Sequence, residues 1–145
     1  MANIAVYSFA DVKAVMYHQN VGQCVLSKQG LGKIGITYNG DLSSHTSTAD
    51  GYVVVNRLRS SNGQITLEVP QNSAADMFLR KWAKYLKNQA KTYIFALTAL
   101  NIVDSAGGFT IYCEGVTPQK IPDRTYDQTS GNVTWTLLAA KITEG

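Results

Sequence analysis

Residues 63–69 read GQITLEV, and residues 72–90 read NSAADMFLRKWAKYLKNQA. This stretch decides the fold, because a strand pattern passes directly into a helix pattern. In its first part Ile65, Leu67 and Val69 alternate with polar residues, and a period of two is typical of a strand with one buried face. We therefore expect the three apolar side chains to point inward, and Thr66 and Glu68 to point outward.

Residues 72–90 are the one convincing helix. Asn72 and Ser73 are good N-cap residues, and Asp76 lies in the first turns, where the helix dipole favours negative charge. The apolar positions recur at helical spacing, which predicts a single buried stripe. That stripe consists of Ala75, Phe78, Leu79, Trp82, Tyr85, Leu86 and Gln89.

Basic residues repeat on the opposite face of the same helix, and we call Arg80, Lys84, Lys87 and Lys91 the basic ridge. With Lys81, this segment holds five of the 13 basic residues. Trp82 and Tyr85 face away from the ridge, so they cannot stack bases there, which argues against a nucleic-acid surface. Two interpretations stay open: a solvated helix face, or an electrostatic docking face for an acidic protein partner.

The rest of the chain reads mainly as strands. Tyr52–Val55 is an apolar run inside the long polar stretch 40–62, and we expect part of that stretch to pair as a strand. Residues 104–108 (DSAGG) read as a hairpin turn and residues 117–132 as a second long loop. The fold class is therefore α+β, with six to eight mostly antiparallel strands and a single helix. The other expected strands are 6–17, 23–27, 33–38, 92–103, 109–115 and 133–142.

Composition excludes several classes of protein. The chain has 145 residues, of which 45% are apolar and 16% charged, with a net charge of +3. One domain of this size can bury a proper core, and the values exclude disorder and coiled coil. The charge is too weak to indicate nucleic-acid binding. No apolar run is long enough for a membrane span, and the N-terminus (MANIAVYSFADVK) does not resemble a secretory signal.

No motif indicates catalysis, a cofactor or a metal. His18 and His45 lie outside any catalytic signature and are expected on the surface, and paired metal-ligand spacing is lacking. Residues 30–33 (GLGK) fail the phosphate-loop spacing. Cys24 and Cys113 are expected to be buried or half-buried thiols in a reducing compartment, although one disulfide stays open. The loop acids give no evidence of a catalytic pair; they are Asp41, Asp50, Asp104, Glu114, Asp123 and Asp127.

Several short motifs, taken in order, carry a family resemblance. The chain opens with VYSFADV at residues 6–12 and continues with KIGIT at 33–37, ADG at 49–51 and QITL at 64–67. After the helix it closes with NVTWT at 132–136 and AKI at 140–142. In order, spacing and total length the chain resembles, over nearly all its residues, the tail tube protein of contractile-tailed bacteriophages.

The resemblance implies a β-sandwich or barrel-like tail tube fold with one flanking helix, as a single domain over residues 1–145. Six copies would form a ring whose inner strands join into a β-barrel, and rings would stack into a tube for DNA delivery inside a contractile sheath. Bores in that family tend to be acidic, whereas this chain is mildly basic. The implied protein is a structural component of the virion, assembled in the host bacterial cytoplasm, and not an enzyme.

The long loop at 40–62 matches the family segment that reaches a neighbouring subunit or ring. The resemblance assigns this assembly arm to Asp41, Leu42, Ser43, Ser44, His45, Asp50, Tyr52, Arg57 and Arg59. The implied partners are other copies of the chain, the tail sheath protein, baseplate and tail terminator proteins, and the tape measure protein and DNA in the lumen, with no membrane insertion. The basic ridge would face the sheath.

Other functions stay open from the sequence. A small β-rich binding or adaptor module would need exposed aromatic side chains, for which Trp135 and Tyr112 could serve, yet Trp135 alternates with Val133 and Leu137 as a core residue does. Another tail component on the same fold, such as a tube initiator, a tail terminator or the tube of a non-phage injection particle, fits the same motifs.

Overall fold

The computed structural model describes residues 11–26, 32–105, 107–129 and 131–145. The N-terminal motif at 6–10, the start of the first expected strand and Gly30 lie outside these residues. The described part contains one α-helix, α1 (Ala74–Lys87), and a short 3-10 helix, η3 (Thr92–Ala96). Its strands are β1 (Val12–His18), β2 (Gly22–Val25), β3 (Lys33–Tyr38), β4 (Ser43–Ser47), β5 (Val53–Arg57), β6 (Gly63–Pro70), β7 (Thr98–Asp104), β8 (Phe109–Pro118), β9 (Asn132–Ala139) and β10 (Lys141–Glu144).

Most expected strands are confirmed, but their number is higher than the six to eight predicted. The polar stretch 40–62 holds two strands, because the apolar run in β5 pairs with the wholly polar β4. The last apolar stretch breaks at Ala140 into β9 and β10. Residues 92–96, expected to begin a strand, form η3 instead.

The main sheet is antiparallel and bends at β8. Its strand order is β2-β1-β7-β8-β9-β6-β3, with β10 also paired to β8. β8 pairs with β7 along most of its length and with β9 only through Thr117 and Pro118. Beside this junction Gly115 has φ +64°, and a Cβ there would lie 2.8 Å from the Cβ of Ala140. The strand therefore turns where only glycine fits.

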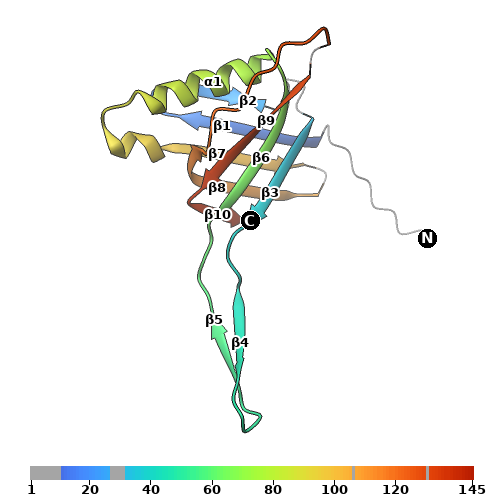
Figure 1. The fold of residues 1–145 in the computed structure, drawn as a ribbon, viewed down its shortest axis with the longest axis vertical. Coiled ribbons are helices and arrows are strands. Elements are labelled where there is room, and N and C mark those ends of the chain that lie inside the picture. The colour runs from blue at the N-terminus through green and yellow to red at the C-terminus, as the bar shows by residue number, and fades with distance from the viewer. Residues whose placement is uncertain (1–10, 27–31, 106, 130) are drawn as a thin grey trace, which may run out of the picture.

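The sheet does not close into a barrel within the described residues, since β2 and β3 end the strand order. Figure 1 shows the bent sheet with α1 lying across one side of it. The predicted fold class is confirmed in that the structure is mainly antiparallel β-sheet with one flanking helix, while a closed barrel is not found in the described residues of this single copy.

The core lies between the bent sheet and α1. In the register of β6 and β9, Leu67 faces Trp135 and Ile65 faces Leu137, and all four side chains are buried. The helix contributes Leu79, Trp82 and Leu86 to the same cluster, and the Nε1 of Trp82 donates a hydrogen bond to the Oγ1 of Thr98 at 2.8 Å. The predicted inward faces of both strands are thus confirmed.

The helix is shorter than the predicted 72–90. It begins after Ser73, whose Oγ accepts a hydrogen bond from the backbone N–H of Asp76. It ends at Lys87, where Asn88 forms the C-cap, so Lys91 of the basic ridge lies beyond it and precedes η3. Asn88 is a poor helix former because its side chain competes for backbone hydrogen bonds.

His18 was expected on the surface but is buried, so that prediction is wrong. Its Nε2 lies 3.3 Å from the carbonyl oxygen of Ile94, and its Nδ1 accepts a hydrogen bond from the backbone N–H of Asn20. The ring also packs edge-on against Tyr85. His18 thus connects the end of β1 to α1 and η3. Both of its ring nitrogens have hydrogen-bond partners within the fold, as is usual for a buried polar side chain.

Candidate assembly surfaces

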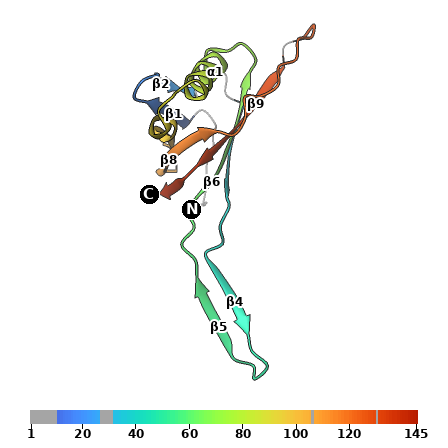
Figure 2. The ribbon, with the colours of Figure 1, turned by 60° about the vertical axis from the view of Figure 1, so that its left-hand side comes forward.

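Strands β4 and β5 form a hairpin that projects from the body of the molecule, and we call residues 41–59 the arm. Figures 1 and 2 show it extending away from the sheet in both views. Within the arm, Asn56 is half-buried and every other residue is exposed. Of the strands that the structure describes, these two pair only with each other.

The predicted arm residues all lie on this hairpin or at its base. Asp41, Leu42, Ser43, Ser44, His45, Asp50, Tyr52, Arg57 and Arg59 are exposed. The side-chain amide of Asn56 donates to the hydroxyl oxygens of Ser44 and Thr46 at 3.2 Å, which links the strands across one face. On the other face Val55 stands opposite His45.

The sequence-based list included the exposed Leu42 and Tyr52 but omitted four other exposed apolar residues of the arm. Side chains of Val53, Val54 and Val55 are 50%, 44% and 66% exposed, and Leu58 is 40% exposed. With Leu42 and Tyr52 they place six apolar side chains in solvent. The signal in the sequence was the apolar run itself, which we interpreted only as a strand. Exposed apolar groups gathered in this way are typical of an interaction surface.

The base of the arm is fixed tightly to the sheet. The backbone N–H of Leu58 donates to the carbonyl of Leu42 at 2.9 Å, which closes the arm at its base. The N–H of Ile142 on β10 donates to the carbonyl of Ser61 at 2.8 Å, which joins the segment after the arm to the sheet. Gly63 leaves no room for a side chain, since a Cβ would lie 2.3 Å from the carbonyl oxygen of Thr37. The direction in which the arm leaves the body is therefore set by the sheet.

A second tie lies next to the base of the arm, between the ends of β3 and β10. The hydroxyl of Tyr38 donates a hydrogen bond to the carboxylate of Glu144. Desolvation of the phenol, and to a lesser extent this hydrogen bond, raises the pKa of Tyr38 to about 12. The phenol thus stays protonated and able to donate at physiological pH.

The basic ridge predicted on α1 divides into two kinds of residue. Lys84 and Lys87 are exposed in the last turn of the helix, and Lys91 is exposed just beyond it. Arg80 is different, because its side chain is only 15% exposed and its Nε lies 3.4 Å from the carboxylate of Asp76. The solvent-facing charge of the ridge therefore comes from its lysines.

Asp76 is the centre of a buried polar cluster that the sequence did not predict. Its side chain is fully buried and accepts hydrogen bonds from the Nε1 of Trp135 at 3.1 Å and from the backbone N–H of Asn72 at 3.2 Å. The guanidinium of Arg124, from the loop between β8 and β9, lies 3.3 Å away. Sequence pattern alone indicated only a dipole contribution from Asp76, since its partners come from distant segments.

Burial would raise the pKa of Asp76, but its hydrogen bonds and the charge of Arg80 hold the pKa below its usual value. The carboxylate is therefore ionised at neutral pH and pairs with two arginines. A buried charge is costly unless it is paired and hydrogen-bonded, and the Asp76 carboxylate is both. The cluster joins α1, β9 and the loop after β8.

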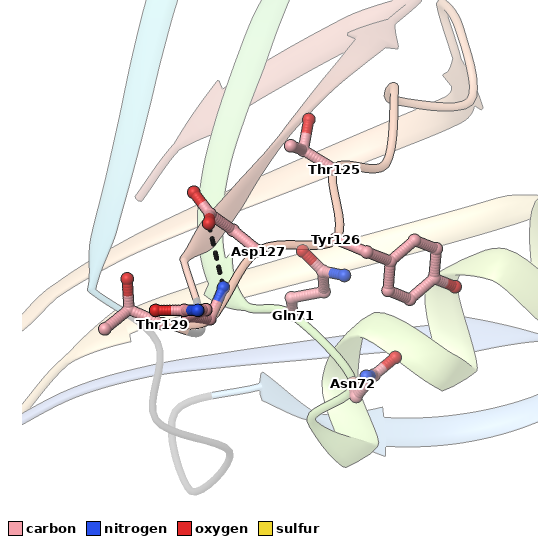
Figure 3. Close-up of a pocket in the computed structure, with 7 residues that line it drawn as sticks. Gln71, Asn72, Thr125, Tyr126, Asp127 and Thr129 are labelled. Atoms are coloured by element: carbon pink, nitrogen blue, oxygen red, sulfur yellow. Dashed lines mark hydrogen bonds between the residues drawn. The ribbon is translucent and has the colours of Figure 1, made fainter.

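The cavities of the described surface are open to solvent. One, of about 220 Å³, lies between the β6–α1 turn and the loop 119–131, where it is lined by Gln71, Asn72 and Tyr126 among others. Figure 3 shows mainly amide, hydroxyl and carboxylate groups around it, with Asp127 accepting a hydrogen bond from the backbone of Gln128. We see no nucleophile and base in contact there.

Within the described residues, no group of three His, Cys, Asp or Glu side chains could hold a metal ion. Cys24 is half-buried and Cys113 buried, and both are free thiols, as expected from the sequence. Burial raises the pKa of Cys113 to about 11. Among the described helices, none has the length and apolar character needed to cross a bilayer.

Comparison with known protein families identifies the chain's relatives. A family model described as the bacteriophage PhiTE tail tube protein matches residues 4–145. The chain belongs to this family. It is a structural protein of the phage tail tube class, as the resemblance implied. No curated protein sequence matches it.

Solved structures share the fold of this tail tube family member at low sequence identity. The tube-terminating cap of the anti-feeding prophage superposes with a TM-score of 0.63 at 11% identity, covering 100% of this chain and 94% of that chain. A chain of the sheath-tube complex of the extracellular contractile injection system PVC gives 0.57 at 14% identity, covering 92% and 88%. A chain from the PVC sheath/tube terminator structure gives 0.53 at 11% identity, covering 100% and 98%.

Proposed function

We propose that this chain is the protomer of a hexameric ring that stacks into a bacteriophage tail tube, without enzymatic activity or a cofactor. The arm carries the proposal. An isolated two-stranded hairpin is marginally stable in water, yet this one projects with six exposed apolar side chains. Contact with another copy in the tube would cover them. A repeated head-to-tail contact of this kind builds a filament.

Ring closure would use the open ends of the sheet. Among the described strands, β2 and β3 end the strand order, so the outer edge of each is open to another strand. Pairing with neighbouring copies would remove these edges and complete a barrel across subunits. The family membership and the open sheet support this arrangement.

The face of β6 and β9 that points away from α1 would line the channel. It carries Gln64, Thr66 and Glu68 on β6, opposite Leu138, Thr136 and Thr134 on β9. These hydroxyl and amide groups and the Glu68 carboxylate would bind a phosphate backbone weakly, since affinity for DNA comes largely from lysine and arginine. Such a lining suits the passage of DNA and a tape measure protein without specific contacts.

The outer face of the tube would carry α1, where the exposed Lys84, Lys87 and Lys91 of the basic ridge would face the contractile sheath, with the half-buried Arg80 paired to Asp76 behind them. The similar structures include a sheath-tube complex, a sheath/tube terminator and a baseplate, which supports sheath, terminator and baseplate proteins as partners. The protein would then reside in the phage tail after assembly in the host cytoplasm.

The experiment is sedimentation velocity and negative-stain electron microscopy of the purified chain at increasing concentration. We expect rings or tubes about 100 Å wide, a width scaled from the subunit size. Val55→Asp places a charge on the arm and should abolish tubes. Met77→Asp is the matched control, because Met77 is 55% exposed on α1, away from the arm. A chain that stays monomeric at every concentration contradicts the proposal.

A second candidate, a tube-terminating cap or terminator on the same fold, is favoured by one observation. The cap of the anti-feeding prophage superposes with a TM-score of 0.63, above the 0.57 of the PVC sheath-tube chain. A terminator would form single rings that do not elongate. The binding-module alternative has less support, because Trp135 is fully buried and cannot bind a ligand from solution, which leaves only Tyr112, 38% exposed, of the two predicted aromatic candidates.

A further inference from the structure

A basic pocket lies where α1 meets the loop between β8 and β9. It has a volume of about 350 Å³ and is lined by Met77, Arg80, Lys81, Lys84 and Arg124. Four of its five lining residues are cations, and none is an acid. With the buried Asp76 beneath it, the local charge is four minus one, or +3.

The floor of the pocket is rigid. Asp76 holds the guanidiniums of Arg80 and Arg124 at 3.4 and 3.3 Å, which leaves their side chains 15% and 26% exposed. The Nη2 of Arg124 also donates to the Oδ1 of Asn72 at 2.8 Å, and its Nη1 donates to the hydroxyl of Tyr126. Two segments of the chain are thereby fixed around one positive site.

The rim of the pocket has uncompensated charge. Lys81 and Lys84 are exposed, and neither forms an ion pair with any described residue. On a helix, like charges three or four positions apart destabilise it, and Lys84 has such neighbours in Arg80 and Lys81. The helix dipole stabilises the charge of Lys84 in the last turn. Lys81 lies outside that turn and receives no such stabilisation. A negative occupant would relieve this repulsion.

We infer that this pocket binds carboxylate side chains of an acidic polypeptide segment from another protein of the particle. The inference rests on the proposed function in one respect, the source of that segment in another protein of the same particle. Rigid guanidiniums suit carboxylates, and Met77, 55% exposed at the wall, offers contact to an apolar residue beside them. Duplex DNA fits less well, since it is bound by charge spread along many phosphates.

The test uses the purified full chain and two capped peptides, Glu-Glu-Leu-Glu-Glu and its glutamine counterpart, titrated calorimetrically at low salt. We expect the acidic peptide alone to bind, with an affinity that falls as salt is added. Lys81→Gln with Lys84→Gln should weaken binding about threefold or more. The matched control is Lys13→Gln with Lys141→Gln, two exposed lysines on β1 and β10, which should change affinity less than twofold.

Three results would overturn the inference: no binding of the acidic peptide, equal loss in the control variant, or pocket-dependent binding of a DNA duplex in place of the peptide. The same variants are also examined for rings and tubes. Normal tubes with no peptide binding reject the pocket and leave the proposed function intact. Peptide binding by a chain that never polymerises supports the pocket and rejects the proposed function.

Discussion

The Nε1 of Trp135 donates a hydrogen bond to the Oδ1 of Asp76 across 3.1 Å, joining residues 59 positions apart in the chain. Both side chains are fully buried. This contact fixes α1 to β9, and the two arginines around the same carboxylate extend it to the loop after β8. One buried carboxylate thus holds α1, β9 and the loop after β8 together.

Asp76→Asn should lower the free energy of unfolding by about 3 kcal/mol, because it removes the charge that compensates two half-buried arginines. Urea unfolding measures this. Asp123→Asn is the control, because the ion pair between Asp123 and Lys120 is exposed. Such a pair should contribute less than about 1 kcal/mol to the free energy of unfolding. Equal small losses in both variants would mean that the cluster does not stabilise the fold.

Stability should also fall in acid because of Asp76. Its pKa is lowered in the folded chain, so the unfolded state takes up the proton first as the pH falls. The contribution is therefore complete above the usual aspartate pKa of about 4 and is lost as the pH drops through that value towards the lower folded pKa. Urea unfolding from pH 7 to pH 3 should show a smaller decrease for Asp76→Asn than for the parent chain. Identical slopes would contradict this assignment.

Gly115→Ala should destabilise the chain more than Gly108→Ala. Both glycines have positive φ, +64° and +66°, but only Gly115 lies against another side chain, that of Ala140. The backbone term is about 1–2 kcal/mol for each, and the clash adds about 1–3 kcal/mol at Gly115. Ala140→Gly in the same chain should remove the added part, as measured by thermal unfolding. No rescue would show that the bend at β8 does not depend on this contact.

Replacing Ser43–Arg57 with a Gly-Gly turn should leave the body folded and stop tube formation. Removing both strands is required, because deletion of β4 alone would leave the valines of β5 without a partner strand. Leu42 and Leu58 already pair at the base, where their backbone groups are 2.9 Å apart. Circular dichroism should report unchanged folding and microscopy no tubes. Tubes formed without the arm would show that stacking depends on another surface.

Local patterns predicted the strands and the helix well. β6 and β3 follow from alternation in GQITLEV and from the apolar residues of KIGITY, and the N-cap at Ser73 follows from residue type. β4 (SSHTS) could not be found this way, since it has no apolar residue and forms only because β5 pairs with it.

The surfaces were harder to predict than the strands. Arg80 was placed on the solvent ridge by helical spacing, but the partner that draws it inward is a carboxylate whose burial depends on β9. Arg124 joins the same site from a loop 48 positions away from Asp76. His18 is buried because η3 and Tyr85 cover it, and neither contact is local. The assembly arm was predicted through family resemblance, whereas its exposed valines became evident only in the structure.

The most direct test of the central claim is a cryo-electron microscopy reconstruction of the polymer formed by the purified chain. We predict stacked rings of six copies, with the arm of each copy contacting another copy and α1 on the outside. A ring with another number of copies, or arms left free in solvent, would contradict the account.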